Sequence, residues 1–352
     1  MSANKNETVR RSIEVEYWVI DNEGYLAEPG GIVDSSEGVE REFVEPLVEV
    51  KTSPCETTEE LRDELFERLE GVLRRADELE KGLVPLGTPV NCGRICELPS
   101  DRNRIQNAVV GDSFECARHC AGTHIHVEQQ PGHEVDQLNT LIALDPALAL
   151  VNSSPYFRGE RTVAGARSQL YRRETYDEVP HQGQLWRYIE TKDEWRRRLE
   201  RRHEEFTARA LKAGVDRRTV EANFCPDSCV WTPVQLREEF GTVEWRSPDT
   251  ALPSEVLRLA DEIAEIAETA CEADVRIDGK TGRVSDDEVV LPEFDSVLVY
   301  LDDAIQEGLA SEDLRSYLRR MGLGVDDYEP VSQNVGGRKH VSKKEARRIR
   351  LE

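Results

Sequence analysis

The sequence contains few lysines, few methionines and few aromatic residues. It has 9 lysines against 37 arginines, only 2 methionines, and 6% aromatic residues. Acidic residues outnumber basic ones by 70 to 46, which gives a net charge of −24. A surface of this charge repels nucleic acids and anionic membranes, so we expect neither as a partner. The acid excess favours adaptation to molar salt, where the Debye length falls to about 3 Å. An ordinary acidic cytosolic protein is the alternative.

Long apolar runs are also missing. The longest, residues 141–151, is interrupted by Asp145 and Pro146, and residues 1–12 have no apolar core of a signal peptide. We therefore expect a cytoplasmic protein without a membrane span. Glycine-rich phosphate-binding motifs and the Gly-x-Ser-x-Gly nucleophile motif are absent as well, so a P-loop, a dinucleotide fold or a serine hydrolase is not indicated.

Eight cysteines in a chain without a secretory signal indicate reduced thiols rather than a disulfide scaffold. Six of them form pairs with the spacing Cys-x-x-x-Cys: Cys92 with Cys96, Cys116 with Cys120, and Cys225 with Cys229. On a helix this spacing would allow a structural zinc or an iron–sulfur cluster. The first and third pairs look like loop and turn, so free thiols are the simpler interpretation.

Alternating polar and apolar residues predict four extended segments. In the first, residues 12–21, Ile13 and Val15 face one side while Glu14 and Glu16 face the other. The other three are residues 43–54 with a bend at Pro46, 121–129 and 241–248. Helical spacing predicts helices from the Thr57 cap to Gly82 and over 134–151, 162–173, 191–213 and 254–273. These elements predict one α+β domain, residues 1–335, followed by a flexible basic tail, residues 336–352.

Ionisable residues recur at alternate positions of four predicted strand faces. Residues two apart on a strand lie about 6–7 Å apart on the same face, so strands that share a sheet could line one cavity. Carboxylates with imidazoles suit Mg²⁺ or Mn²⁺, and arginine beside such ions suits phosphate. The alternative is the solvated face of an antiparallel sheet. The four pairs are Glu14 with Glu16, Glu49 with Lys51, His124 with His126, and Glu244 with Arg246.

Five motifs occur in an order that resembles the type 2 glutamate–cysteine ligases, also called carboxylate–amine ligases. They are SIEVEYWVID, EFVEPLVEVKTSPC, CAGTHIHVEQ, ALALVNSSPYFRGERT followed by ARS, and GTVEWRSPDT. The resemblance covers residues 11–260 and is strongest to the version from halophilic archaea. It implies a glutamine synthetase-like fold, in which a curved antiparallel sheet holds ATP, metal and glutamate on its concave face and packs helices on its convex face.

The resemblance also implies roles for individual residues. Arg246 would contact the transferring phosphate, and Arg167 would contact phosphate or the substrate carboxylate. His126 would stand behind the metal ligands, and Asn152 with Ser153 would form the Asn-Ser-Pro turn of the family, beside the cofactor. The implied metal ligands are Glu14, Glu16, Glu42, Glu49, His124 and Glu244.

The activity implied by the resemblance is an ATP- and Mg²⁺-dependent ligation. The γ-carboxylate of L-glutamate would attack the γ-phosphorus of ATP, and the amine of L-cysteine would attack the resulting acyl phosphate, giving γ-glutamylcysteine. A monomer or homodimer is expected. Two alternatives stay open: the same ligase with a different amine, and a non-catalytic thiol or metal sensor built on the cysteine pairs.

Overall fold

The computed structural model describes residues 9–90 and 95–334, and its centre is a seven-stranded sheet. The strand order is β2-β3-β1-β5-β9-β8, with β4 paired to the end of β1. Every neighbouring pair is antiparallel, which confirms the predicted antiparallel sheet. The strands are β1 (Arg11–Asp21), β2 (Val39–Arg41), β3 (Leu47–Lys51), β4 (Lys81–Val84), β5 (Thr123–Glu128), β8 (Val234–Arg237) and β9 (Thr242–Trp245).

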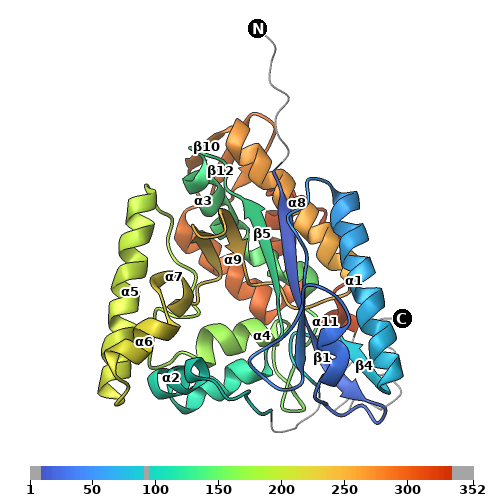
Figure 1. Cartoon of the computed structure of the whole chain (residues 1–352). Coiled ribbons are helices and arrows are strands. Elements are labelled where there is room, and N and C mark those ends of the chain that lie inside the picture. Colours follow the sequence, from blue (N-terminus) through green and yellow to red (C-terminus); the bar gives the residue numbers. More distant parts are fainter. Residues whose placement is uncertain (1–8, 91–94, 335–352) are drawn as a thin grey trace.

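Three helices pack against one face of this sheet: α1 (Thr58–Glu78), α3 (Glu134–Leu144) and α8 (Pro253–Glu272). Figure 1 shows α1 and α8 running beside β1 and β5. The apolar side of β1, including Ile13 and Val15, is buried in the core that these helices share with the sheet. Helix α1 begins with the predicted capping box, in which Thr57 and Glu60 satisfy each other's backbone N–H groups.

A second group of elements faces the opposite side of the sheet. Helix α5 (Lys192–Lys212) contacts α2 (Asp101–Val110), α6 (Arg217–Asn223) and α7 (Pro226–Cys229), and these stand together at the left and bottom of Figure 1. Two further segments belong to this side, the 3₁₀ helix η2 (Asp112–His119) and the short helix α4 (Ala166–Gln169), which continues into the π-helical turn η4 (Leu170–Glu174).

The C-terminal third adds a small three-stranded sheet and further helices. The strand order is β10-β12-β11, and β10 and β12 run parallel. No helix in residues 9–90 and 95–334 is long and apolar enough to cross a membrane. The remaining elements are η1 (Gly30–Asp34), η3 (Asp145–Val151), β6 (Tyr156–Phe157), β7 (Glu160–Arg161), β10 (Asp274–Ile277), β11 (Arg283–Val284), β12 (Glu288–Leu291), α9 (Phe294–Gln306), η5 (Gly308–Ala310), α10 (Glu312–Arg320), η6 (Val325–Asp327) and α11 (Val331–Asn334).

Four predicted elements differ from the structure. The helix expected to reach Gly82 ends at Glu78, because Glu80 adopts a positive φ of 56° and the chain enters β4. The helix over 134–151 becomes a 3₁₀ helix at Asp145, since Pro146 has no N–H to continue it. The helix over 162–173 covers only α4 and the π-helical η4. In segment 43–54, only Leu47–Lys51 forms a strand. The tail, residues 336–352, lies outside the described residues.

Asp145, the acid that interrupts the longest apolar run, is fully buried and joins three parts of the fold. Its Oδ2 accepts a hydrogen bond from Arg172 Nη2 of η4 at 2.8 Å. Its Oδ1 accepts one from Trp245 Nε1 of β9 at 2.9 Å, and another from the Ser247 hydroxyl. A charge removed from water is tolerated only with such partners. The ion pair of Asp145 with Arg172 therefore anchors the end of β9 to the helical side of the molecule.

Substituting Asp145→Ala should lower the free energy of unfolding by about 3–5 kcal/mol, because it leaves the buried guanidinium of Arg172 without its counter-charge. Chemical denaturation at neutral pH measures this loss. Asp145→Asn, which keeps an acceptor oxygen, should lose less. A loss below about 1 kcal/mol for the alanine variant would contradict a structural role for the pair.

Candidate active site

The register of β1 with its two neighbours brings acidic and basic side chains to one face of the sheet. Glu14 lies directly opposite Lys51 of β3 and opposite His124 of β5. Glu16 lies opposite Glu49 of β3. Residues paired directly across antiparallel strands point to the same face, with Cβ atoms about 4.5–5.5 Å apart. The predicted strands therefore share a sheet, and their polar residues share one face of it.

Strand β9 extends the polar face on the other side of β5. His126 lies opposite Glu244, and Arg246 follows two residues later, directly after the strand. Glu244 is 1% exposed, and its Oε1 accepts a hydrogen bond from Arg246 Nη1 at 3.0 Å. Its Oε2 accepts one from Arg237 Nη1 of β8 at 2.6 Å. Two guanidinium groups thus hold one buried carboxylate in place.

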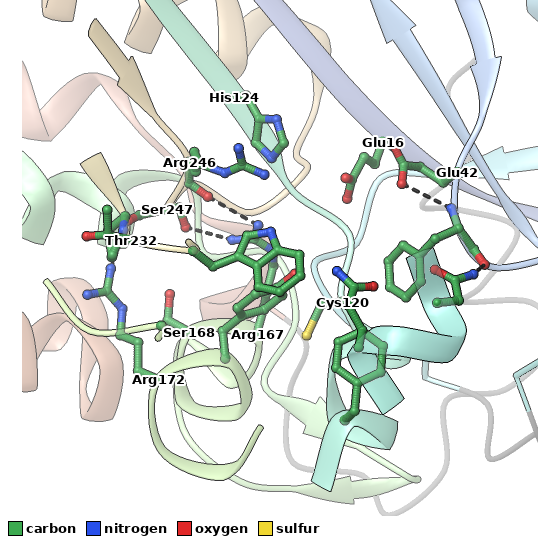
Figure 2. Close-up of a pocket in the computed structure, with 18 of the residues that line it drawn as sticks. Glu16, Glu42, Cys120, His124, Arg167, Ser168, Arg172, Thr232, Arg246 and Ser247 are labelled. Carbon is green, nitrogen blue, oxygen red and sulfur yellow. Dashed lines mark hydrogen bonds between the residues drawn. The ribbon is translucent and has the colours of Figure 1, made fainter. Parts of the chain in front are cut away.

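A cavity opens between this face and the helical side of the molecule (Figure 2). Carboxylates of the sheet line it together with guanidinium groups, of which that of Arg246 follows β9 and the others come from the helical side, and aromatic rings fill the remaining wall. Such a cavity can hold a ligand that carries both metal-bound phosphate and free carboxylate groups. Its lining includes Glu16, Glu42, His124, Arg102, Arg167, Arg172, Arg246, Phe43, Phe114, Tyr171 and Trp231.

Arg167 lines the cavity in a fixed position. Its Nη1 donates to the Ser247 carbonyl at 3.0 Å and its Nη2 to the Arg246 carbonyl at 3.2 Å, while its buried Nε has no partner among the described residues. A Cβ at Gly122 would lie 2.1 Å from Arg167 Nη2, so a side chain there would displace the guanidinium. The Gly122 N–H also donates to Glu16 Oε2 at 2.6 Å. Glycine before the His-x-His strand is therefore required by close approach.

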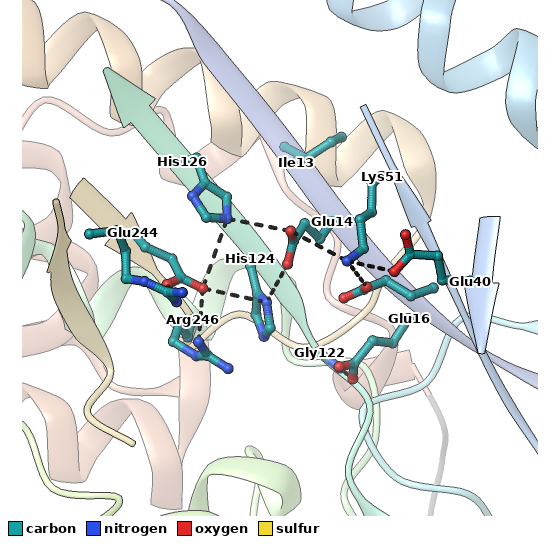
Figure 3. Close-up of polar contacts among 12 residues, drawn as sticks. Ile13, Glu14, Glu16, Glu40, Lys51, Gly122, His124, His126, Glu244 and Arg246 are labelled. Atoms are coloured by element: carbon teal, nitrogen blue, oxygen red, sulfur yellow. Dashed lines mark hydrogen bonds and ion pairs between the residues drawn. The ribbon is translucent and has the colours of Figure 1, made fainter. Parts of the chain in front are cut away.

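Two imidazoles stand between two carboxylates at the centre of the polar face (Figure 3). His124 Nδ1 lies 3.0 Å from Glu14 Oε2 and 3.6 Å from Glu244 Oε1. His126 Nε2 lies 3.8 Å from a carboxylate oxygen of each glutamate. The Nδ1 atom of His126 lies 3.1 Å from the Thr242 hydroxyl, and its buried Nε2 has no hydrogen-bond partner within the described part of the chain. A buried nitrogen aimed at two carboxylates fits a bound cation.

Three overlapping groups on this face could hold a metal ion, each with its ligand atoms within 4.8 Å of one another. Carboxylate oxygens with at most one imidazole are a donor set that suits Mg²⁺ or Mn²⁺. The groups are Glu14 with His126 and Glu244, Glu14 with Glu49 and His124, and Glu16 with Glu42 and Glu49. They include every residue for which a metal-ligand role was predicted, and also His126.

None of these groups contains a cysteine. The seven cysteines in residues 9–90 and 95–334 are all free, and burial raises the pKa of Cys116 to about 11 and that of Cys229 to about 12. The pair Cys92–Cys96 includes a residue outside the described ranges. The arrangement of the described cysteines therefore fits the free-thiol interpretation and gives the zinc and iron–sulfur alternatives no support.

The acidic end of the polar face holds protons at neutral pH. Burial, then the charge of Glu49, raises the pKa of Glu16 to about 7. Burial together with Glu16 raises the pKa of Glu42 to about 8, and burial together with Glu42 does the same for Glu49. Three carboxylates this close cannot all ionise without a compensating cation.

The opposite end is ionised. Burial favours the neutral form of Glu244, but Arg246 and His126 outweigh it and hold its pKa at about 2. Burial, then the charge of Arg246, lowers the pKa of His124 to about 4. Burial also opposes ionisation of Glu14, yet its hydrogen bond with His124 and the nearby imidazole of His126 keep its pKa below the usual range. A neutral His124 then donates its Nδ1–H to Glu14, and its other ring nitrogen carries the lone pair that a metal needs.

Asn152 and Ser153 are not brought to this face. Asn152 Nδ2 donates to the Ala304 carbonyl of α9 at 3.0 Å, and the Ser153 N–H donates to Asp249 Oδ2 at 3.0 Å. Both residues are 1% exposed, and neither is among the described residues that line the cavity. In this structure they anchor the turn after η3 to its neighbours.

Comparison with known proteins shows to which family the chain belongs. The sequence model of glutamate–cysteine ligase family 2 (GCS2) matches residues 12–349. The chain belongs to this family. No curated protein matches this GCS2 chain by sequence.

Two solved structures show that the GCS2 chain shares its fold with known ligases. A bifunctional glutathione synthetase from Pasteurella multocida superposes with a TM-score of 0.60 at 14% identity, over 97% of this chain and 52% of that one. The GCS2 chain thus spans about half the length of that enzyme. A glutamate–cysteine ligase from Francisella tularensis, solved in complex with AMP, gives a TM-score of 0.53 at 13% identity, over 98% of this chain and 89% of that one.

Sequence reasoning missed three arginines of the GCS2 site: Arg102, Arg172 and Arg237. A signal existed for Arg237, because the alternation of Val234 to Arg237 is that of a strand with its polar residues on the side of Glu244. No local pattern marks the other two. Arg102 donates to the Asn223 and Ser228 carbonyls, 121 and 126 residues away.

Binding of Mg²⁺ or Mn²⁺ to the protein should release about two protons at pH 7, because Glu16, Glu42 and Glu49 must lose the protons that they hold at this pH to become ligands. The pKa values of these carboxyl groups, about 7 to 8, set the pH range in which the metal affinity changes. Metal affinity should rise as the pH passes through this range and level off above it. Calorimetric titration in two buffers of different ionisation enthalpy counts the protons. An affinity that does not change across this range would contradict the protonated triad.

Proposed function

We propose that the protein joins the γ-carboxylate of L-glutamate to the amine of L-cysteine at the expense of ATP, giving γ-glutamylcysteine. The observation that carries the proposal is the cavity in which the face of carboxylates and imidazoles meets the fixed guanidinium groups of Arg246 and Arg167. Membership of glutamate–cysteine ligase family 2 supports the reaction class and the two amino acids. The AMP in the Francisella structure supports an adenine nucleotide as the co-substrate.

The carboxylate and imidazole face would hold the metal ions. Mg²⁺, or Mn²⁺ in its place, supplies positive charge that neutralises phosphate oxygens during transfer. We assign this role to Glu14, Glu16, Glu42, Glu49, His124 and Glu244, with His126 beside them. All of these residues except Glu42 lie on strands of the sheet, which keeps their ligand atoms together before ligands bind.

Two arginines would act on the reacting groups. Arg246 is held by Glu244 at 3.0 Å and lines the cavity, so its guanidinium can stabilise charge on the transferring phosphoryl group. Arg167 lines the same cavity, with its guanidinium held by the carbonyl groups of Arg246 and Ser247, and can bind a phosphate or the substrate carboxylate. Asn152 and Ser153 would serve the nucleotide only indirectly, by fixing the chain behind the cavity.

The reaction then needs two displacements. A γ-carboxylate oxygen of glutamate attacks the γ-phosphorus and ADP leaves, which forms a γ-glutamyl phosphate. The amine nitrogen of cysteine attacks the acyl carbon, phosphate leaves, and the amine gives up a proton. No covalent bond to the protein forms. The protein contributes positioning and electrostatic stabilisation.

Product analysis tests the proposal directly. The protein is incubated in concentrated salt with ATP, Mg²⁺, L-glutamate and a mixture of amino acids that includes cysteine, and the products are identified by mass spectrometry. We expect γ-glutamylcysteine together with ADP. A different γ-glutamyl amide would retain the mechanism and change the amine. The absence of any ATP-dependent product would overturn the ligase assignment.

Glu14→Gln and Glu244→Gln should each reduce kcat by about a hundredfold or more, because each removes a charged ligand and leaves an amide of the same shape. Steady-state kinetics measures the loss, and circular dichroism with a melting curve checks that the fold is retained.

Glu128→Gln is the matched control, since Glu128 lies on β5 but pairs with Arg10 rather than with the site. This pair is partly exposed, so its loss should leave both stability and turnover close to the parent values. An equal loss of activity in all three variants would show that the effect is not specific to the polar face.

A further inference from the structure

One lysine stands among the carboxylates of the polar face. The ammonium nitrogen of Lys51 lies 2.8 Å from Glu49 Oε2, 3.0 Å from Glu40 Oε2 and 3.9 Å from Glu14 Oε1. Figure 3 shows it between Glu14 and Glu40. Glu14 and Glu49 belong, with His124, to one of the three candidate metal groups. The lysine therefore contacts two carboxylates that a metal ion would also need.

The three carboxylates around Lys51 differ in exposure. The Glu49 side chain is 5% exposed, that of Glu14 is 26%, and that of Glu40 is 61%. Glu40 lies on β2, directly opposite Glu49 across the β2–β3 pair. It is not part of any metal group in the described structure. It offers the ammonium group a position that is near the site but outside it.

The choice of lysine at this position is informative in a chain with 37 arginines and 9 lysines. A guanidinium is a planar fork that binds a carboxylate through two bonds and stays in place. An ammonium is a compact charge on a flexible stem and can move between neighbouring acceptors. A lysine can thus compensate Glu49 and Glu14 without permanently occupying the site.

We propose that Lys51 is a built-in counter-ion that competes with the metal at Glu14, Glu49 and His124, and that it moves to Glu40 when the metal binds. In the absence of metal, Lys51 limits the repulsion between the carboxylates and keeps the face assembled. In its presence, the charge of the metal ion at these oxygens repels the ammonium at short range, so the ammonium is displaced. Lys51 then sets how tightly the site binds its cation. The inference depends on the metal site proposed above.

The test is a titration of Mn²⁺ into the full-length protein, followed by electron paramagnetic resonance, at a pH of about 9, where protons no longer compete. Lys51→Met should bind Mn²⁺ about tenfold more tightly at the metal group, because the competing charge is gone. Lys51→Arg keeps the charge and should bind no more tightly than the parent. Without metal, Lys51→Met should melt at a lower temperature than the parent and gain more from added Mn²⁺.

Glu40→Gln separates displacement from simple charge effects. Removing the alternative position confines the ammonium to the metal group, so Mn²⁺ affinity should fall about threefold. In the Lys51→Met background the same substitution should change nothing, because no ammonium remains to be moved. As Glu40 is exposed, this variant keeps the inference testable even if Lys51→Met does not fold without metal.

The outcomes distinguish this inference from the proposed function. If the parent protein binds no Mn²⁺, the proposed metal site itself fails. If the parent binds Mn²⁺ but Lys51→Met binds equally or more weakly, the metal site stands and the role of Lys51 is overturned, since the lysine then only orients Glu49. An effect of Glu40→Gln that persists without Lys51 would show a direct electrostatic contribution and would also overturn the displacement.

Discussion

The pairing register of β1 between β3 and β5 is the constraint on which the polar face depends. Side chains alternate along a strand, so a shift of one residue would turn Glu14 and Glu16 into the core and bring Val15 to the cavity. The register is fixed by burial of the alternate residues, among them Ile13 and Val19, against helices of the opposite face. The free energy that stabilises the fold therefore also holds the ligand atoms together.

Electrostatics determines where along this face a cation is needed. At the β9 end, Glu244 is balanced by Arg237 and Arg246, and the buried charge costs little. At the β3 end, Glu16 and Glu42 have no guanidinium within hydrogen-bonding distance among residues 9–90 and 95–334, and they retain protons. The fold thus keeps one half of the site ionised and leaves the other half dependent on protons, an ammonium group or a metal ion. This asymmetry places the greatest gain from cation binding at the acidic end.

The sequence was sufficient for the strands of the polar face, because alternation is a local property that survives folding. The positions of Glu14, Glu49, His124 and Glu244 could be predicted for this reason. Glu42 could not be placed in this way, since it lies in the turn before β3 and reaches the site through that turn. Glu42 was predicted as a metal ligand only because of the family resemblance.

The roles of the buried polar residues on the helical side could not be predicted from the sequence. In the sequence, Asp145 only interrupts an apolar run. Its structural role depends on hydrogen bonds to Arg172 and Trp245, which lie 27 and 100 residues away. A buried polar residue is explained by partners that are distant in the chain, and a single sequence contains no record of them. The same holds for the guanidinium of Arg102, whose acceptors belong to another helical segment.

These limits explain why the reaction class is easier to infer than the amine. The residues proposed for the metal and phosphate chemistry lie mostly on strands, where spacing in the sequence becomes spacing in the site. The wall that faces those strands comes from α2, η2, α4 and the segment around Trp231, which meet only in the folded chain. Aromatic surfaces such as Phe43 and Phe114 can accept more than one side chain, and shape alone discriminates weakly between small apolar groups. Under the proposed function, selection among amines would therefore depend on how this wall is assembled and not on the motifs that identify the family.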